Sequence, residues 1–403
     1  MGRGRRSRAR GPRVLAQAPL GRRAAHVELT AGTVVVGAGI AGCAAATFLA
    51  RGGSTVVVVD SGGIGAGASG RNGGFLFRQP LGWVNDLLAE SLEIYEEVAD
   101  GPVPFDLTTW PMLVLAVEED ELEAARAYAE AVGGEEVDLG ADPWFADDLA
   151  GGFVVEGGRT LDAMGATAAL AEAARREGVE FRLGCEAKRV LVEGGRVTGL
   201  ATDEGVLRCE RVVLATGPWL RMLLRSLGVD LPITSSRGWL FETGRVDPSP
   251  PYAIEQALWP VQDEMASVVG APTVREVADG ATEEPGIVSL LLGGRPGGRC
   301  LIGTSLRRSL LDEPEGPETI RRLAERAARV SPALEDVPVL ASWSGRRAHT
   351  PDGLPVVGPV PGIEGLVVAG GFSSIGMVTA PAACRRLAGG DASLFDPARF
   401  AAD

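Results

Sequence analysis

The feature that most constrains this fold is a strand, a glycine-rich loop and a helix, followed by a second strand that ends in an acid. Residues 33–36 are all β-branched and predict a buried strand, and the small residues over 43–51 predict the helix. The loop between them has GxGxxG spacing, and a strand predicted over 55–59 ends at Asp60. In this order the loop and the helix N-terminus bind a pyrophosphate, and the acid accepts ribose hydroxyl groups. The sequence therefore predicts that a dinucleotide is bound by Gly37, Gly39, Ile40, Ala41, Gly42 and Asp60.

The same apolar run raises the alternative of a secretory signal or a membrane span. Residues 1–30 carry eight arginines, and residues 29–50 carry no charge. Cleavage after this run would remove the glycine loop, however, and a signal peptide has no reason to be followed by a second strand and an acid. The other long uncharged run, 365–384, is interrupted by glycines, serines and a proline. We therefore expect no membrane span and a cytoplasmic location.

The basic leader is expected to be separate from the folded chain. Residues 1–30 lack apolar periodicity and predict a disordered segment, which is either a misassigned start or a targeting sequence. They contribute +7 to a formal charge of −14, which leaves −21 for the remainder. A body this acidic is a poor partner for nucleic acid. The five cysteines have no CxxC spacing and only two histidines are present, so we expect neither disulfides nor a metal site.

A second glycine-rich loop follows Asp60. Residues 61–77 are too rich in glycine for a helix and too many for a simple turn. One interpretation is a flexible linker. The other is a loop whose backbone lies against a flat, polar ring system, which an arginine and an asparagine set among glycines favour. The second interpretation makes these residues candidate contacts: Ser69, Gly70, Arg71, Asn72, Gly73 and Gly74.

The rest of the chain indicates an α/β fold with a second domain inserted. A helix is predicted over 161–177, and strand–loop–helix patterns recur near the C-terminus, whereas 236–310 is rich in strands and contains a hairpin through Pro296 and Gly297. We therefore predict a Rossmann-type nucleotide domain built from discontinuous segments and an α+β substrate domain with an antiparallel or mixed sheet. The predicted boundaries are 31–82, 155–235 and 335–403 for the first domain, and 83–154 and 236–334 for the second.

Taken together, these segments resemble the glycine oxidase and D-amino-acid oxidase (DAO) family of FAD-dependent oxidoreductases, from about residue 33 to the C-terminus. The resemblance is carried by both glycine loops with Asp60 and by four further segments. These are Ala215-Thr216-Gly217-Pro218-Trp219, Trp343-Ser344-Gly345-Arg346-Arg347, Thr350-Pro351-Asp352-Gly353-Leu354-Pro355, and Gly370-Gly371-Phe372 with Gly376.

The resemblance implies FAD, with adenosine on Asp60 and the pyrophosphate over the first glycine loop. It implies an adenine-contacting strand through Ala187 and Lys188, and further contacts at Ala215, Gly217 and Trp219. It also implies a helix start aimed at the pyrimidine edge of the flavin, formed by Phe372, Ser373, Ser374, Ile375, Gly376 and Met377. Residues 340–352 contain no cysteine of the kind that attaches flavin in sarcosine oxidases, so we expect non-covalent FAD.

The family also implies the reaction: oxidation of the C–N bond of an amino acid or N-substituted glycine, with hydride transfer to flavin N5 and hydrolysis of the imine. Arg347 would grip the substrate carboxylate as a bidentate fork, or alternatively form a structural ion pair. A second enzymatic hypothesis is a flavin 2-hydroxy-acid dehydrogenase with His349 as base. A third is an electron-relaying or non-catalytic flavin subunit of a hetero-oligomer. The electron acceptor, O2 or another compound, and the oligomeric state stay open.

Overall fold

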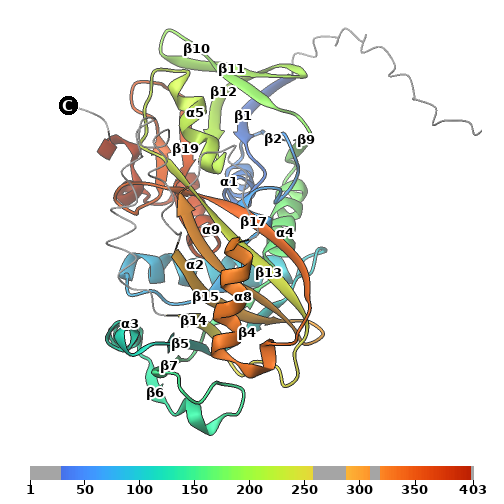
Figure 1. Cartoon of the computed structure of the whole chain (residues 1–403). Coiled ribbons are helices and arrows are strands. Elements are labelled where there is room, and N and C mark those ends of the chain that lie inside the picture. Colours follow the sequence, from blue (N-terminus) through green and yellow to red (C-terminus); the bar gives the residue numbers. More distant parts are fainter. Residues whose placement is uncertain (1–28, 257–286, 309–317, 401–403) are drawn as a thin grey trace, which may run out of the picture.

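The computed structural model of the chain describes residues 29–256, 287–308 and 318–400 (Figure 1). The expected leader, apart from its last two residues, lies outside these ranges. The described part contains two eight-stranded sheets and one three-stranded sheet. In Figure 1 the first large sheet lies at the upper end of the molecule and the second at the lower end.

The first sheet is the nucleotide-binding type that the sequence predicts. Its strand order is β10-β11-β12-β1-β2-β9, with β19 paired to β12 and β18. The bounds are β1 (Leu29–Val36), β2 (Val56–Asp60), β9 (Glu180–Leu183), β10 (Ala187–Glu193), β11 (Arg196–Thr202), β12 (Gly205–Leu214), β18 (Val356–Pro359) and β19 (Leu366–Gly370). The run β9-β2-β1-β12-β19 is parallel, whereas β10, β11 and β12 pair antiparallel. The valines of β1 and β2 are buried on both faces, as parallel strands require.

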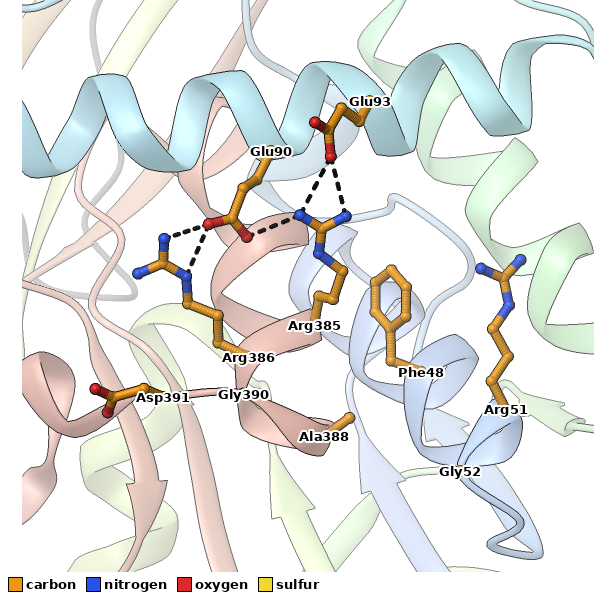
Figure 2. A pocket seen from close by; sticks show the side chains of 11 residues that line it. Phe48, Arg51, Gly52, Glu90, Glu93, Arg385, Arg386, Ala388, Gly390 and Asp391 are labelled. Atoms are coloured by element: carbon orange, nitrogen blue, oxygen red, sulfur yellow. Dashed lines mark hydrogen bonds and ion pairs between the residues drawn. The ribbon is translucent and has the colours of Figure 1, made fainter.

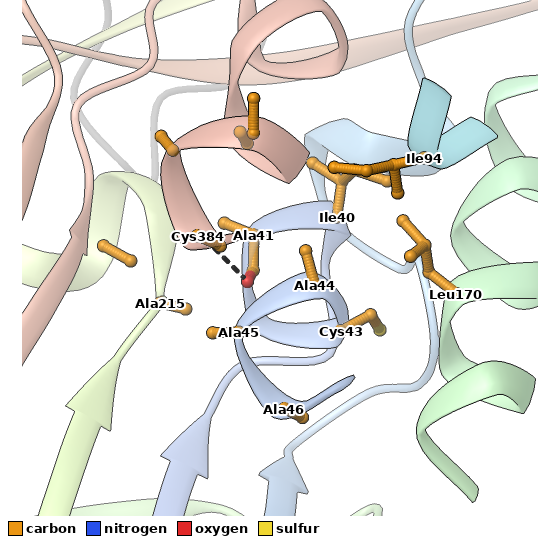
Figure 3. Packing of buried hydrophobic residues seen from close by; sticks show 14 of the residues in the cluster. Ile40, Ala41, Cys43, Ala44, Ala45, Ala46, Ile94, Leu170, Ala215 and Cys384 are labelled. Atoms are coloured by element: carbon orange, nitrogen blue, oxygen red, sulfur yellow. Dashed lines mark hydrogen bonds between the residues drawn. The ribbon is translucent and has the colours of Figure 1, made fainter. Parts of the chain in front are cut away.

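Four helices, three of them rich in alanine, cover one face of this sheet. They are α1 (Ile40–Arg51), α2 (Gly82–Ala99), α4 (Ala163–Arg176) and α9 (Gly376–Gly389). Small side chains let these helices approach one another and share one hydrophobic core with the sheet (Figure 3). The other face packs under the β10–β11 hairpin and α5 (Leu220–Arg225).

The second large sheet has the order β17-β13-β16-β15-β14-β5-β7-β6. It is mixed, because β14 and β5 are parallel and the other pairs are antiparallel. The bounds are β5 (Met112–Ala116), β6 (Glu135–Val137), β7 (Gly151–Val155), β13 (Thr234–Arg245), β14 (Ala253–Gln256), β15 (Ile287–Arg295), β16 (Arg299–Arg308) and β17 (Val339–His349). Helix α8 (Glu318–Val330) packs on one face, and α3 (Leu122–Val132) packs on the other over β5 and β7. A small sheet of β3 (Phe75–Leu76), β8 (Arg159–Leu161) and β4 (Leu107–Thr109) completes the fold.

This architecture confirms the predicted fold class, and it corrects three element boundaries. The first strand begins at Leu29 rather than at residue 33, because it pairs with β12 from Leu29 onward. Helix α1 begins at Ile40, so the last glycine of the GxGxxG motif belongs to the helix. The helix predicted from residue 161 begins at Ala163, because Leu161 lies in β8 and the Asp162 side chain caps the helix by accepting from Met164 N. The division into two domains at the predicted boundaries stays a prediction.

Within the described ranges, no helix combines the length and the apolarity needed to cross a membrane. All five cysteines are buried and unpaired.

The glycines of the first motif permit contacts that no side chain could allow. Gly37 has φ +109°, and a Cβ there would collide with the carbonyl oxygen of Ala215 at the end of β12. A Cβ at Gly42 would collide with the carbonyl oxygen of Gly37. Helix α1 therefore packs directly against the turn that precedes it, which is the role proposed for the third glycine of such motifs.

We expect Gly42→Ala to lower the free energy of unfolding by about 1–3 kcal/mol or more, because the methyl group would force α1 away from the turn. Chemical denaturation of the purified protein measures this change. Gly82→Ala is the matched control, since a Cβ at Gly82 meets no atom within 4 Å and the residue is helical. That control should change the free energy by less than about 1 kcal/mol. Equal stability of the two variants would contradict the packing argument.

Candidate functional site

The carboxylate of Asp60 lies at the turn between β1 and α1. Its Oδ2 accepts a hydrogen bond from Ala38 N at 2.8 Å, and its Oδ1 accepts one from Gly62 N at 2.7 Å. The acid therefore ties the first glycine loop to the start of the second loop. A carboxylate has about four lone-pair sites, so two backbone donors leave acceptor capacity for ribose hydroxyl groups.

The second glycine loop folds back onto the N-terminus of α1 instead of extending as a linker. Ser69, in the short 3₁₀ turn η1 (Ala68–Gly70), accepts a hydrogen bond from Ile40 N at 2.9 Å, and Gly65 N donates to Ala38 O at 2.9 Å. The amides of the first helical turn have no partner within the helix, and they attract negative charge. Ser69 thus brings the second loop to the place where a phosphate would bind.

Asn72 holds the shape of this loop. Its Nδ2 donates to Ser69 O at 2.7 Å and to Ala68 O at 3.1 Å, and its Oδ1 accepts from Gly74 N at 2.8 Å. The side-chain amide of Asn72 therefore forms its hydrogen bonds within the loop. Arg71 beside it is exposed, and its backbone lies against Gly345 of β17, with Arg71 O 3.4 Å from the position of a Cβ there. The loop thus reaches the second sheet.

A buried hydroxyl without a partner marks the end of β12. Ala215 N donates to Val36 O at 2.8 Å, so this strand end lies beside the first glycine loop. The next residue, Thr216, has a buried Oγ1 that makes no hydrogen bond in the described structure. Buried polar atoms are normally satisfied, so an unpaired hydroxyl beside the glycine loop is a candidate contact for a bound group. The Thr216 hydroxyl, the α1 N-terminus and Asp60 converge as a dinucleotide requires, so the residues present fit FAD.

The segment between β9 and β10 passes Asp60. Leu183 pairs with Asp60 in the sheet, and Cys185 N donates to Asp60 O at 3.0 Å. Ala187 and Lys188 follow at the start of β10, where Lys188 forms an exposed ion pair with Glu186 at 2.5 Å. The structure therefore brings this segment toward the predicted adenosine end, with the lysine side chain held by its neighbour. Trp219 is 40% exposed, in a short 3₁₀ turn that contacts β17.

The turn before α9 contains Ser373, which among the residues that the structure describes is the one non-glycine residue with a positive φ. Ser373 has φ +49°, a conformation that costs a side chain strain and that clusters at functional sites. Gly371, Phe372, Ser374 and Ile375 complete the turn, and α9 starts at Gly376 and Met377. Ser373 N donates to Ala348 O at 2.8 Å, so this turn is fastened to the end of β17.

His349 lies buried between two serines. Its Nε2 is 2.6 Å from Ser236 Oγ of β13, and its Nδ1 is 2.9 Å from Ser373 Oγ. Burial, together with the nearby Arg347 charge, lowers the pKa of His349 to about 3. The imidazole is therefore neutral near pH 7, and each ring nitrogen has a hydroxyl partner.

Arg347 is a largely buried cation on the same face of β17. Its Nη1 donates to Ser305 O at 2.9 Å, and its Nη2 donates to Thr304 Oγ1 at 2.6 Å. Among the described residues it has no carboxylate partner. Burial lowers its pKa to about 10, so it stays protonated near pH 7.

Arg347 and Arg346 lie on opposite faces of the sheet. Arg347 is opposite Ser236 across the β13–β17 pair, whereas Arg346 is opposite Arg237, and successive residues of a strand point to opposite sides. The structure therefore brings Arg347, His349 and Ser373 together, and it places Arg346 away from them. Ser236, Thr304 and Ser305 were missed by sequence reasoning, because no motif marks them and their partners lie far away in the chain.

A surface pocket elsewhere has a structural explanation. Figure 2 shows it between α2 and the C-terminal ends of α1 and α9. Its arginines are paired with acids: Arg385 with Glu90 at 2.9 Å and Glu93 at 3.3 Å, and Arg386 with Glu90. The pocket lies at the far end of α1 from the glycine loop, about 18 Å along the helix. We assign these ion pairs to the packing of α9 on α2.

The comparisons with known proteins agree with this geometry. The model of the DAO family, described as FAD dependent oxidoreductase, matches residues 33–389. The chain is 30% identical to glycine oxidase of Pseudomonas putida over 394 residues, covering 91% of this chain and 97% of that protein. It is 29% identical to D-amino acid dehydrogenase of Cereibacter sphaeroides, covering 60% of this chain and 49% of that protein. The crystal structure of glycine oxidase from Geobacillus kaustophilus superposes with a TM-score of 0.76 at 24% identity, covering 93% of this chain and all of that one.

We expect Asp60→Asn to weaken FAD binding by about 1–3 kcal/mol, because the amide loses a charged acceptor and places a donor beside backbone N–H groups. Titration of the apoprotein with FAD, followed by flavin fluorescence, measures the dissociation constant. Asp391→Asn is the control, because Asp391 also accepts one backbone amide, Ser393 N at 2.8 Å, near the C-terminus. Equal FAD affinity of both variants would show that Asp60 is not a cofactor contact.

We expect His349 to make the protein less stable in acid. The unfolded histidine has a pKa near 6.5 and the folded one about 3, so the unfolded state binds the extra proton in this window. The contribution is complete above about pH 6.5 and is lost as the pH falls toward 3, by about 1.4 kcal/mol per pH unit. Urea unfolding at about pH 7 and pH 5 should show a smaller loss for His349→Asn than for the parent protein. Equal losses would mean that His349 is accessible to protons in the folded state.

Proposed function

The chain belongs to the DAO family of FAD-dependent oxidoreductases, and we propose that it oxidises the C–N bond of an amino acid or an N-substituted glycine. The relatives named glycine oxidase and D-amino acid dehydrogenase support this reaction class. The observation that carries the proposal is Arg347, a largely buried cation without a carboxylate partner among the described residues.

FAD would be held by the two glycine loops, Asp60, Thr216 and the turn at Ser373. Asp60 would bind the ribose, the α1 N-terminus and Ser69 would flank the pyrophosphate, and the turn before α9 would lie against the flavin. When bound, the cofactor supplies the acceptor for the hydride that leaves the carbon next to nitrogen. The protein contributes orientation and the exclusion of water.

Arg347 orients the substrate by its carboxylate. Its bonds to Thr304 and Ser305 fix the guanidinium against β16 and leave further N–H groups for a second acceptor. A charged, planar donor of this kind binds a carboxylate through two parallel hydrogen bonds. An extended substrate anchored there lies on the face of the sheet that meets the second glycine loop.

His349 favours amine oxidation over hydroxyl oxidation. A 2-hydroxy acid needs a general base for its hydroxyl proton, and a histidine whose pKa is lowered to about 3 is a weak base. An amine that binds in its neutral form needs no side-chain base. His349 instead positions Ser373 and Ser236 through its two ring nitrogens.

The electron acceptor is proposed to be O2 or another electron acceptor, and the location is proposed to be the cytoplasm. Five buried, unpaired cysteines are consistent with a reducing compartment.

Anaerobic mixing of the FAD-loaded protein with panels of D-amino acids, L-amino acids, N-methyl amino acids and 2-hydroxy acids tests the reaction. We expect the amino-acid panels to bleach the flavin absorbance. Reduction by hydroxy acids alone would support the dehydrogenase alternative. A flavin that no panel reduces, but that a strong chemical reductant does, would support an electron-relaying subunit.

We expect Arg347→Lys to lower kcat/KM for a carboxylate substrate, with a loss of transition-state stabilisation of about 1.5–3 kcal/mol, because lysine keeps the charge but loses the bidentate geometry. FAD content should be retained. Arg346→Lys is the matched control on the opposite face of β17 and should cost much less. Loss of activity in the Arg346 variant alone would reverse the assignment, and loss in neither would replace the amino acid by a neutral amine.

A further inference from the structure

A row of directly opposed residues connects β14 to β17 across the second sheet. The strand register pairs each member with the next. The row consists of Glu255, Leu291, Gly303, Leu240 and Trp343. Directly opposed residues of paired strands share one face. Trp343 and Arg347 are four residues apart on β17 and also share a face, so Glu255 lies on the same face of the sheet as Arg347.

This face meets the segment that follows the second glycine loop. Phe75 packs against Gly293 of β15, and Gly293 lies on the same face as Leu291, two residues away. Arg295 at the end of β15 donates to Gly73 O at 3.3 Å. The row that ends in Glu255 therefore runs beside the proposed flavin-binding loop.

The distance between Arg347 and Glu255 sets the length of a substrate that could contact both. The guanidinium of Arg347 reaches across β13 to Thr304 and Ser305 on β16. Strands β16 and β14 have β15 between them, so about 10 Å separates the guanidinium from the strand of Glu255. This span suits an amino acid with a long side chain.

Among the residues that the structure describes, none brings a positive charge to Glu255. Its Oε2 is 3.3 Å from the Tyr128 hydroxyl of α3, and no described arginine or lysine forms an ion pair with it. The Tyr128 hydroxyl also donates to Arg78 O at 2.9 Å. Since a hydroxyl carries one proton, the contact with Glu255 is made best when the carboxyl group keeps its own.

Burial raises the pKa of Glu255 to about 7. A buried carboxylate is costly unless a cation or several donors stabilise it. The described protein supplies one neutral partner, Tyr128. A ligand that carries a positive charge to this place would stabilise the ionised form.

We propose that Glu255 binds the cationic end of the substrate side chain, so that the enzyme acts on basic amino acids held between Arg347 and Glu255. This inference rests on the proposed function, since it assigns the α-carboxylate to Arg347. Lysine and arginine have the length and the terminal charge that the two groups require. Glu255 is thus a specificity-determining residue at the end of the sheet row.

Lysine and norleucine, which differ by the terminal ammonium, provide the test. The FAD-loaded protein is mixed anaerobically with each compound in both enantiomers, and the rate of flavin reduction is followed against concentration. We expect lysine to be preferred, and Glu255→Gln to lower the lysine-to-norleucine ratio by about tenfold to a hundredfold while norleucine is unaffected. Glu255→Leu should reverse the preference, because an apolar end then faces the side chain.

Tyr128→Phe is the matched control for a structural role. It removes the hydroxyl partner and keeps the acid, so the lysine preference should survive. If Glu255 served only to hold α3 through Tyr128, the Tyr128 and Glu255 variants would lose stability alike and leave the substrate ratio unchanged. That result would overturn the proposal.

Thermal stabilisation of the protein by lysine or norleucine, measured without oxygen, separates this inference from the proposed reaction. Stabilisation by lysine that depends on Glu255, without flavin reduction by any amino acid, would support the binding site and reject the reaction. Turnover with the same lysine-to-norleucine ratio in the parent protein and in Glu255→Gln would support the reaction and reject the site.

Discussion

The cofactor-binding half of this protein depends on how closely the chain approaches itself at Gly37. The carbonyl oxygens of Gly37 and Ala215 occupy the space where side chains at Gly42 and Gly37 would stand. This contact packs β1, α1 and β12 so tightly that the amides at the start of α1, Asp60 and Thr216 converge at one edge of the sheet. The proposed phosphate and ribose contacts are therefore consequences of backbone packing, and a single methyl group would disturb all of them.

The second sheet is attached to this edge through the end of β17. Ser373 N bonds to Ala348 O, and His349 bonds to Ser236 of β13 and to Ser373 of the turn before α9. The same strand carries Arg347, whose guanidinium is fixed on β16. A shift of β17 would thus move the turn before α9 and the substrate cation together. This coupling gives a physical reason for the strained φ of Ser373, which the surrounding bonds hold in place.

Features that arise within a short segment could be predicted from the sequence. The GxGxxG loop, Asp60 and the strand–loop–helix unit that ends in α9 follow from local patterns, because glycine, β-branched residues and alanine have strong local preferences. The loop over 61–77 bonds to the start of α1 and does not extend as a linker, whereas its contacts with a cofactor, Asn72 included, stay a prediction. The Asn72 amide bonds within the loop to Ala68, Ser69 and Gly74. The observed element boundaries differ from the predicted ones where strand pairing or helix capping intervenes, as at Leu161 and Ala163.

The fold class, the glycine loop with Asp60 that we propose for the dinucleotide, and the alternation that separates Arg346 from Arg347 could be predicted from the sequence, because each depends on residues that are neighbours in the chain. The tertiary structure alone decided which groups meet Arg347 and His349: Ser236 comes from β13, Thr304 from β16 and Ser373 from the turn before α9. It also decided that Glu255 shares their sheet face. Strand register is set by pairing between distant segments, and a slip of one residue would turn the side chains on these strands to the opposite face.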